Sequence, residues 1–228
     1  MKKEIYILIG PAAIGKSTFV KRAGFPEDKL SIINRDDVVG EVSKRYNLSY
    51  DDLYHFPPHD SIPGSYIPGF EQYGRVIESP HVVAHLHPYS YEYLNSINAE
   101  INYRFYNEFQ TAIRDNNKQF IVIDRVHMRK YERAQYFPFM EYGRENYVVT
   151  GVVFNFKDED TLDLIEQASA IRTKQMIESG QRPRTVTRAV QEKMLQFYEE
   201  PTMEEGFNSI ITVDTLPNLR GLLKTTHV

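Results

Sequence analysis

The chain has 228 residues, of which 41% are hydrophobic and 25% are charged, and its formal net charge is −4 at pH 7. This balance predicts one soluble globular domain and argues against a strongly basic nucleic-acid coat, while the absence of cysteine excludes disulfides and thiolate metal sites. No apolar stretch approaches the roughly 20 residues that a membrane span needs, and the first apolar run is too short for a secretory signal, so we expect a cytoplasmic protein.

Short apolar runs rich in Ile, Val and aromatic residues predict buried parallel strands, because strands covered on both faces show no polar alternation. The runs span residues 5–9, 30–33, 120–123 and 147–156, with a further candidate at 210–213. Helical patterns separate them at residues 16–23, 37–46, 91–116, 129–145, 160–178 and 187–198. The longest helix carries apolar or aromatic side chains at a spacing of three and four: Tyr91, Leu94, Ile97, Ile101, Phe105, Phe109 and Ile113. This alternation predicts an α/β fold, a doubly wound parallel sheet with helices on both faces.

Residues 48–90 interrupt the alternation, and they contain half of the chain's prolines and most of its histidines. A loop of this length is uncommon inside a compact domain and is often functional, so we expect one long insertion within a single domain spanning 1–228. His81, His85 and His87 could bind a metal, but the chain has no cysteine to complete a zinc site. The aromatic residues of 48–106 either stack on bases or belong to a core.

Residues 10–17 read Gly-Pro-Ala-Ala-Ile-Gly-Lys-Ser between the first predicted strand and a helix, which is the pattern of a P-loop. Glycines let backbone N–H groups approach a phosphate chain closely, and the following helix presents its positive end. Lys16 would reach the β- and γ-phosphates, Ser17 would hold Mg²⁺, and Thr18 is placed for the α-phosphate. The pattern therefore predicts a P-loop NTPase-type fold with ATP and Mg²⁺ as cofactors. The residues expected to bind the nucleotide are Gly10, Ala13, Gly15, Lys16, Ser17 and Thr18.

Two acids, Asp36 and Asp37, follow the second predicted strand in the run Asn-Arg-Asp-Asp. Ligands of open α/β sheets bind beyond the carboxyl ends of the strands. One of these acids could accept the proton of an attacking hydroxyl, as a positioned Asp does in kinases. The alternative is that Asp36 or Asp37 only caps the next helix.

The third predicted strand ends in Asp124, a Walker-B-like pattern whose carboxylate supports Mg²⁺ or the acceptor. Five basic residues follow it: Arg125, His127, Arg129, Lys130 and Arg133. They either hold an anionic acceptor or form the solvated face of a helix.

A second basic segment spans residues 172–188 and is interrupted by Gly180 and Pro183. Its basic residues are Arg172, Lys174, Arg182, Arg184 and Arg188. The pattern predicts a helical lid that closes over transferring phosphate, where an arginine stabilises the developing charge. A charged helical hairpin is the alternative.

The order of these motifs resembles that in the kinase domain of phage-type 5′-polynucleotide kinases. The motifs are the P-loop, the Asn-Arg-Asp-Asp run, the strand-end Asp124 and the arginine-rich lid. The resemblance is clearest over residues 4–45, 119–136 and 165–214. It implies that Lys16 and Ser17 bind the donor phosphates and Mg²⁺, and that Asp36 is the general base. It also implies that Asp124 positions the acceptor or the metal. The lid arginine could be Arg172, Arg182 or Arg184.

The acceptor side departs from the family's pattern. Val39 stands where the family has an arginine for the acceptor phosphate, and Arg125 replaces a small polar residue after the strand-end Asp. No Asp-x-Asp-Gly-Thr phosphatase signature is present. We therefore expect a kinase whose first-choice acceptor is a polynucleotide 5′-hydroxyl of DNA or RNA, contacted by Asp36, Asp124, Arg125 and Arg129.

Three alternatives remain open at the level of the sequence. The acceptor could be a hydroxymethylated base in DNA, which would make the protein a DNA-modification enzyme of the phage-related type. It could instead be a small molecule such as a nucleoside or a sugar. The chain could also be a nucleotide-gated binding module without enzymatic activity.

Overall fold

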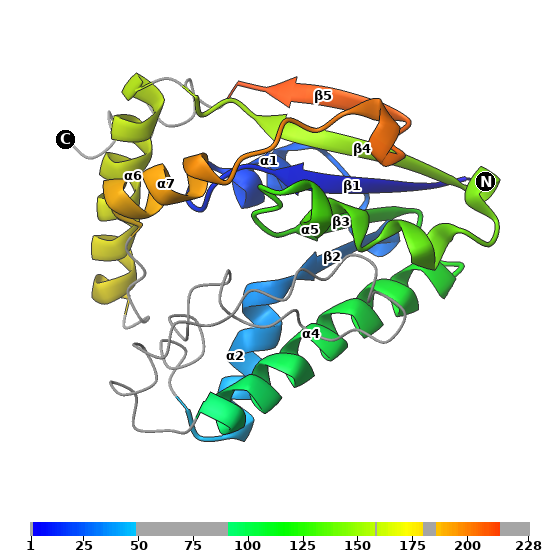
Figure 1. The fold of residues 1–228 in the computed structure, drawn as a ribbon, viewed down its shortest axis with the longest axis horizontal. Helices are drawn as coiled ribbons and strands as arrows, with labels where there is room; N and C mark the ends of the chain where they lie inside the picture. Colours follow the sequence, from blue (N-terminus) through cyan, green and yellow to red (C-terminus); the bar gives the residue numbers. More distant parts are fainter. Residues whose placement is uncertain (1, 49–90, 158, 180–185, 215–228) are drawn as a thin grey trace. The chain divides into compact units, whose positions relative to one another are not determined.

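The computed structural model describes residues 2–48, 91–157, 159–179 and 186–214 (Figure 1). Almost all of the predicted insertion lies outside these residues, including His81, His85 and His87, and so do Arg182 and Arg184 of the predicted lid. The strands are β1 Lys3–Ile9, β2 Leu30–Asn34, β3 Phe120–Asp124, β4 Tyr147–Phe154 and β5 Ser209–Val213. The helices are α1 Lys16–Arg22, α2 Arg35–Arg45, α4 Tyr91–Arg114, α5 Lys130–Ala134, α6 Glu159–Glu178 and α7 Arg188–Gln196. Short 3-10 turns occur at η1 Glu27–Lys29, η4 Phe137–Met140, η5 Arg144–Asn146 and η6 Met203–Glu205.

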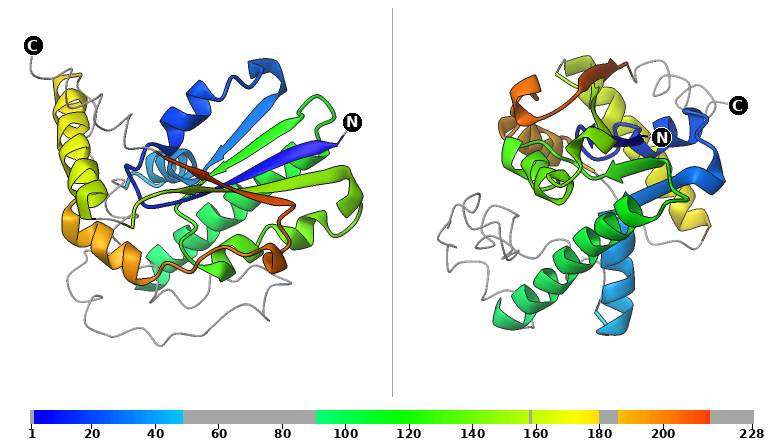
Figure 2. Two further views of the ribbon diagram at one scale, coloured as in Figure 1. Left: turned by 90° about the horizontal axis from the view of Figure 1, so that it is seen from above. Right: turned by 90° about the vertical axis from the view of Figure 1, so that its right-hand side faces the viewer.

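The five strands form one sheet in the order β2-β3-β1-β4-β5. The central strand β1 pairs in parallel with β3 on one side, where Ile7 faces Ile123, and with β4 on the other, where Ile9 faces Val153. β5 pairs in parallel with β4. The views in Figures 1 and 2 together show α5 on one face of this sheet and α1 on the other. The α/β fold with a parallel sheet and helices on both faces is thereby confirmed, and the carboxyl ends of β1, β3 and β4 lie at one edge.

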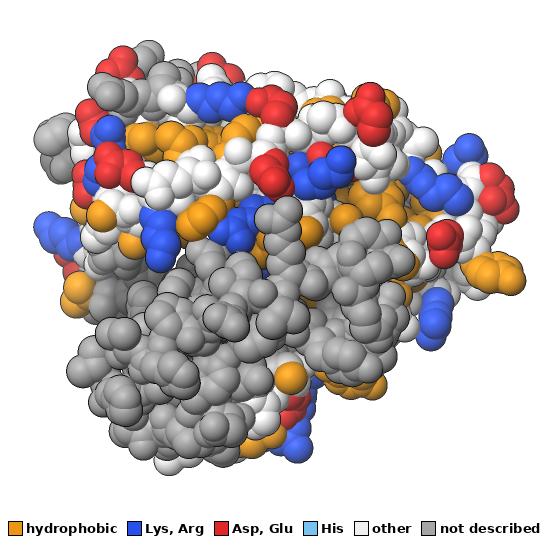
Figure 3. Space-filling view, in the orientation of Figure 1, with side chains coloured by type: hydrophobic (Ala, Val, Ile, Leu, Met, Phe, Trp, Pro, Cys, Tyr) orange, Lys and Arg blue, Asp and Glu red, His pale blue; other side chains and the backbone are white. Residues whose placement is uncertain are grey.

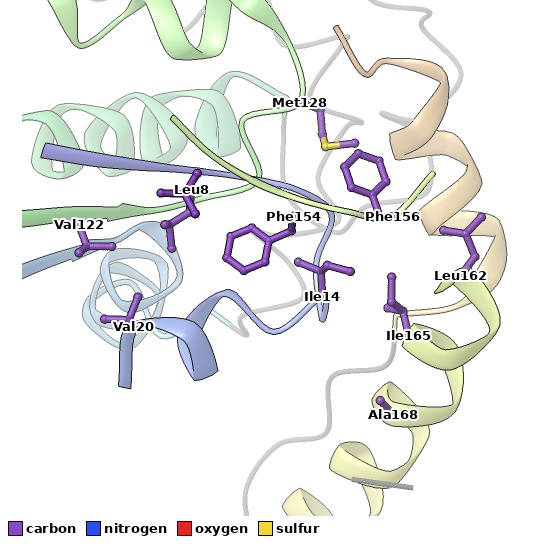
Figure 4. Close-up of a cluster of buried hydrophobic side chains, with 11 residues drawn as sticks. Leu8, Ile14, Val20, Val122, Met128, Phe154, Phe156, Leu162, Ile165 and Ala168 are labelled. Carbon is purple, nitrogen blue, oxygen red and sulfur yellow. The ribbon is translucent and has the colours of Figure 1, made fainter. Parts of the chain in front are cut away.

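The chain divides into two compact units, residues 1–32 with 116–228 and residues 33–115. The first unit has a hydrophobic core built from the strands, α1 and α6 (Figure 4). Leu8, Val122 and Phe154 come from three strands, and Val20 of α1 and Ile165 of α6 pack in the same cluster. This core ties the helix of the predicted lid to the strands that precede the P-loop and Asp124.

The second unit is built on α2 and α4. The predicted apolar face of the long helix is confirmed at its described positions, where Ile97, Ile101, Phe105 and Phe109 are almost fully buried. At the end of α2, the carboxylate of Glu100 accepts hydrogen bonds from the Tyr46 hydroxyl at 2.5 Å, from Arg45 at 2.8 Å and from Arg104 at 2.8 Å. Glu100 therefore fastens the end of α2 to α4, just before the chain enters the segment 49–90.

The helix predicted over residues 129–145 is wrong. The chain forms only α5 there, followed by the two 3-10 turns η4 and η5. Pro138 stands in the first turn of η4, and Gly143 has the left-handed φ of 81° before η5. This φ favours glycine, whereas the nearest atom to a Cβ here would be Nδ2 of the Asn146 side chain, which can turn away. Proline and left-handed glycine end helical patterns even where the surrounding residues favour a helix.

None of the described helices combines the length and the hydropathy that a membrane-spanning segment requires.

Candidate active site

The loop between β1 and α1 has the geometry that its two glycines predict. Gly15 adopts a left-handed conformation with φ 104° at the start of α1. A Cβ at Gly10 would lie 3.1 Å from Cβ of Phe154, so the chain can pass β4 this closely only without a side chain. Ile14 is fully buried in the core and anchors the loop between the glycines. The loop is therefore held in shape by the sheet beneath it.

The ammonium of Lys16 lies inside this loop. Its Nζ donates to the carbonyl oxygens of Gly10 at 3.0 Å and Pro11 at 2.7 Å, and the residue is almost fully buried. A buried ammonium needs such acceptors, because desolvating an unpaired charge is costly. The ammonium of Lys16, which is predicted to reach the β- and γ-phosphates, is thus hydrogen-bonded to carbonyl oxygens of the loop. Thr18 follows in the first turn of α1 and is half-buried.

Ser17 and Asp124 are joined directly. The Ser17 hydroxyl donates to Oδ2 of Asp124 at 3.0 Å, although the two residues are 107 positions apart in the chain. Asp124 ends β3 and is 8% exposed. A hydroxyl beside a carboxylate is a set of hard oxygen donors that suits Mg²⁺, which usually takes only one or two protein ligands in addition to water and phosphate oxygens. The described residues contain no cluster of three or more His, Asp or Glu side chains that could hold a metal alone.

Two of the five basic residues after Asp124 are interior residues. Arg133 is fully buried and makes a two-pronged ion pair with Glu205, through Nε at 2.7 Å and through a terminal nitrogen at 2.8 Å. His127 is also fully buried, and burial followed by the charge of Arg125 holds its pKa well below the usual 6.5. The interpretation as a solvated helix face is wrong for both residues, and neither side chain lies where it could meet a dissolved anion.

Arg125 and Arg129, the two predicted acceptor contacts, are partly exposed. A terminal nitrogen of Arg125 lies 3.8 Å from a carboxylate oxygen of Glu132. The Arg129 guanidinium stacks 3.9 Å above the ring centroid of Phe197, and the Arg129 backbone N–H donates to Glu132 at 3.0 Å. Both arginines therefore lie around one glutamate on α5. On the face shown in Figure 3, Lys and Arg of the described residues are interspersed with Asp and Glu and do not form a continuous stripe.

Of the three candidate lid arginines, Arg172 is the one within the described residues. It projects from α6, and one terminal nitrogen donates to the carbonyl of Ala13 in the P-loop at 3.1 Å. Ala13 has φ 65°, a left-handed conformation that is uncommon for a residue with a side chain. Burial lowers the pKa of Arg172 below its usual value, but an arginine remains protonated at physiological pH. The described part of the predicted lid thus places one guanidinium against the glycine-rich loop between β1 and α1.

Arg188, at the start of α7, forms ion pairs with Asp163 of α6 and Glu192 of α7. Thr187 caps α7 by accepting from the N–H of Val190. These contacts join the two helices on either side of the segment 180–185. Arg188 therefore has a structural role that agrees with the hairpin interpretation for this end of the segment.

In the second unit, the cap of α2 is Asn34 and neither of the two acids. Its Oδ1 accepts from the backbone N–H of Asp36 at 2.8 Å. The alternative in which Asp36 or Asp37 caps the helix is therefore wrong. Asp36 is half-buried and Asp37 is exposed, both in the first turn of α2, while Val39 is fully buried. A signal for the cap was present in the sequence, since Asn is among the preferred N-cap residues.

Sequence reasoning missed the partners of the buried polar residues. Glu205 was outside every predicted site, and Tyr136 was assigned only to a helix. Tyr136 is fully buried, and its hydroxyl lies 2.6 Å from Nε2 of His127. A basic residue near a strand-end Asp gives no sign of burial until its distant acid partner is known.

Comparison with known proteins adds information on the fold. No protein-family model and no curated protein matches the chain. A candidate kinase from Chloroflexus aurantiacus J-10-fl is similar in structure, with a TM-score of 0.54, 12% identity and coverage of 100% of this chain and 96% of that one. At this identity the likeness shows the fold alone, an α/β fold with a parallel sheet.

Two further structures are similar at lower scores. A fungal RNA kinase has a TM-score of 0.49 and 13% identity, with 98% of this chain and 84% of that chain covered. A chain from the PezAT toxin–antitoxin system of Streptococcus pneumoniae has a TM-score of 0.48 and 14% identity, with 93% and 69% covered. Both scores are too low to carry an argument about this protein.

Proposed function

We propose that this protein is an ATP- and Mg²⁺-dependent kinase that transfers the γ-phosphate to a hydroxyl of a nucleic acid, with a polynucleotide 5′-hydroxyl as the first-choice acceptor. The observation that carries the proposal is the hydrogen bond between Ser17 of the P-loop and Asp124 at the end of β3. A glycine-rich turn formed by chance has no reason to place its serine on a carboxylate from a distant strand.

The donor half of the mechanism follows from residues of the first unit. Lys16 leaves its two carbonyl acceptors for the β- and γ-phosphate oxygens, since anionic oxygens bind an ammonium more strongly than neutral carbonyls do. Ser17 and Asp124 would hold Mg²⁺, which would supply positive charge to offset the negative charge of the transferring phosphate. Arg172, already in contact with the loop, provides a guanidinium for the charge that develops on the transferring phosphoryl group.

The acceptor half rests on the sequence pattern. We propose Asp36 as the general base that takes the proton of the attacking hydroxyl. The oxygen of that hydroxyl bonds to the γ-phosphorus as the proton leaves. The bond from that phosphorus to the bridging oxygen breaks, and ADP leaves. Arg125 and Arg129 are proposed to contact the acceptor. We also propose that the two units act as one kinase domain, with an insertion at about 48–90 and a lid at about 172–188.

A hydroxymethylated base in DNA is the second candidate acceptor. The observation that favours it is the complete burial of Val39. The resemblance places the arginine for an acceptor phosphate at this position, and a valine packed in a core cannot replace it. An acceptor without a phosphate beside the attacking hydroxyl would not need that arginine.

A substrate panel tests the proposal. Radiolabelled ATP is incubated with 5′-hydroxyl DNA and RNA oligonucleotides, with DNA containing hydroxymethylated pyrimidines, and with nucleosides and sugars, using Lys16→Met as the inactive control. Label at 5′ ends supports the first candidate, whereas label released with the modified base supports the second. Label on small molecules alone rejects nucleic acid as the substrate, and label on none of the acceptors rejects kinase activity.

A further inference from the structure

We infer that His127 is a positioning residue that fixes Asp124 relative to the P-loop, and thereby sets the geometry of the Ser17–Asp124 pair. The inference rests on the proposed function, because it concerns how that site is held. His127 lies three residues after Asp124, on the loop that joins β3 to α5. It is fully buried, so it does not meet a substrate itself.

Both ring nitrogens of His127 are used. Nδ1 lies 2.8 Å from the carbonyl oxygen of Leu8, and Nε2 lies 2.6 Å from the hydroxyl of Tyr136. A carbonyl can only accept, so Nδ1 must carry the proton, and Nε2 then accepts from the tyrosine. This arrangement defines one neutral tautomer and one ring orientation.

The partner on the Nδ1 side belongs to the strand that leads into the P-loop. Leu8 is two residues before Gly10, and the Gly10 N–H itself donates to the carbonyl of Val126 at 3.0 Å. Two consecutive residues after Arg125 thus hold the end of β1, Val126 through its backbone and His127 through its side chain. The segment that follows Asp124 is thus hydrogen-bonded to the residues at the start of the P-loop, which leads to Ser17.

The other side of the loop is fixed by the buried ion pair. Arg133, held by Glu205, donates to the carbonyls of His127 at 3.1 Å and Met128 at 3.3 Å. His127 also has φ 50°, a left-handed conformation that residues with a side chain rarely adopt. Such a conformation persists only where the surroundings impose it, and it occurs frequently at functional sites.

Removing the Nδ1 bond should therefore loosen the metal site without removing any nucleotide contact. His127→Leu leaves the Leu8 carbonyl without its donor and disfavours the left-handed backbone. His127→Asn is the conservative variant, since its amide nitrogen can occupy the place of Nδ1 and Asn tolerates left-handed φ. Outer partners of a metal site typically contribute about 10–100-fold in metal affinity or activity.

The experiment uses AMP-PNP, an ATP analogue that does not transfer its phosphate, so that it needs no acceptor. Calorimetry gives the AMP-PNP affinity of the full chain with EDTA and across a Mg²⁺ titration. For His127→Leu we expect a rise of about 10–100-fold in the Mg²⁺ concentration that gives half of the maximal increase in AMP-PNP affinity. The AMP-PNP affinity in EDTA should stay within about twofold of that of the unsubstituted protein. His127→Asn should stay within about threefold of the unsubstituted protein in its Mg²⁺ response.

Val149→Ala, a truncation of a fully buried residue in β4, is the matched control for general destabilisation. An unchanged Mg²⁺ response in His127→Leu, or an equal shift in Val149→Ala, overturns the inference and leaves the proposed function standing. Absence of AMP-PNP binding by the unsubstituted protein overturns both. If His127→Leu does not fold, His127→Gly takes its place, because it also removes the Nδ1 donor while glycine tolerates the left-handed φ. A Mg²⁺ response identical to that of the unsubstituted protein then overturns the inference.

Discussion

The residues proposed to bind phosphate in the first unit and the first turn of α2 in the second unit are held by contacts of different kinds. In the first unit the proposed catalytic groups are bonded within the site, Ser17 to Asp124 and Arg172 to the P-loop carbonyl of Ala13. In the second unit, the N-terminal turn that carries Asp36 is held by its own cap, Asn34. The described contacts thus link the proposed donor residues across distant segments of the chain, whereas the contact at the start of α2 joins residues two positions apart.

Arg172→Met is expected to have the largest effect and tests the donor half of the comparison. If this guanidinium stabilises the transferring phosphoryl group, kcat should fall about 10³–10⁵-fold while the affinity for ATP changes little. Single-turnover transfer from labelled ATP measures the rate. Lys174→Met is the control, because it removes a cation from the same helix at a position whose side chain is 80% exposed. A loss of less than about tenfold in Arg172→Met would move the role to Arg182 or Arg184.

Asp36→Asn tests the acceptor half. Loss of a general base typically costs about 10²–10⁴-fold, so transfer should fall by that factor while calorimetry shows unchanged ATP binding. Asp37→Asn, which changes the exposed neighbour in the same helical turn, should leave transfer nearly unchanged. If phosphoryl transfer is unchanged in Asp36→Asn, Asp36 is not the general base and the proposed acceptor half of the mechanism fails.

Glu205→Gln tests whether the stability of the first unit depends on the buried ion pair between Arg133 and Glu205. The substitution leaves the charge of Arg133 uncompensated at a fully buried position, and breaking such a pair costs about 3–5 kcal/mol. Urea denaturation measures the free energy of unfolding. Glu204→Gln, at the exposed neighbouring position, should change it by less than about 0.5 kcal/mol. Equal effects of the two substitutions would mean that the ion pair does not hold the loop.

These residues also show what could be predicted from the sequence. The P-loop, Asp124 and the strands were predictable because short-range patterns determine them, as the buried stripe of α4 illustrates. The burial of Arg133 was not, because it depends on Glu205, which lies 72 positions away. The long helix predicted after Arg129 does not form because Pro138 and the left-handed Gly143 interrupt a pattern whose other residues favour a helix. The acceptor contacts could not be derived because Val39 and Arg125 depart from the family's pattern inside segments where the resemblance is otherwise clear.

The smallest predicted effect concerns the pH dependence of the second unit. The hydrogen bond from Tyr46, assisted by Arg104 and Arg45, lowers the pKa of Glu100 below its usual 4.5. A depressed carboxyl pKa stabilises the fold above the unfolded-state value, and this stabilisation is lost as the pH falls through the folded-state value. Glu100→Gln should therefore reduce stability at pH 7 by about 1 kcal/mol or less, and the difference should disappear in acid.

Glu108 provides the opposite case on the same helix. Burial, followed by the nearby charges of Glu41 and Asp37, raises its pKa. Its ionised form therefore opposes folding at neutral pH, so Glu108→Gln should raise stability slightly at pH 7 and lose that gain in acid. Urea unfolding at pH 7 and at a pH well below 4.5 measures both variants, because the contribution of Glu100 is lost only as the pH falls through its lowered folded-state pKa. If the two substitutions change the free energy of unfolding at pH 7 in opposite directions, local charges determine the stability of the second unit. If both change it in the same direction, a property common to α4 outweighs these local charges.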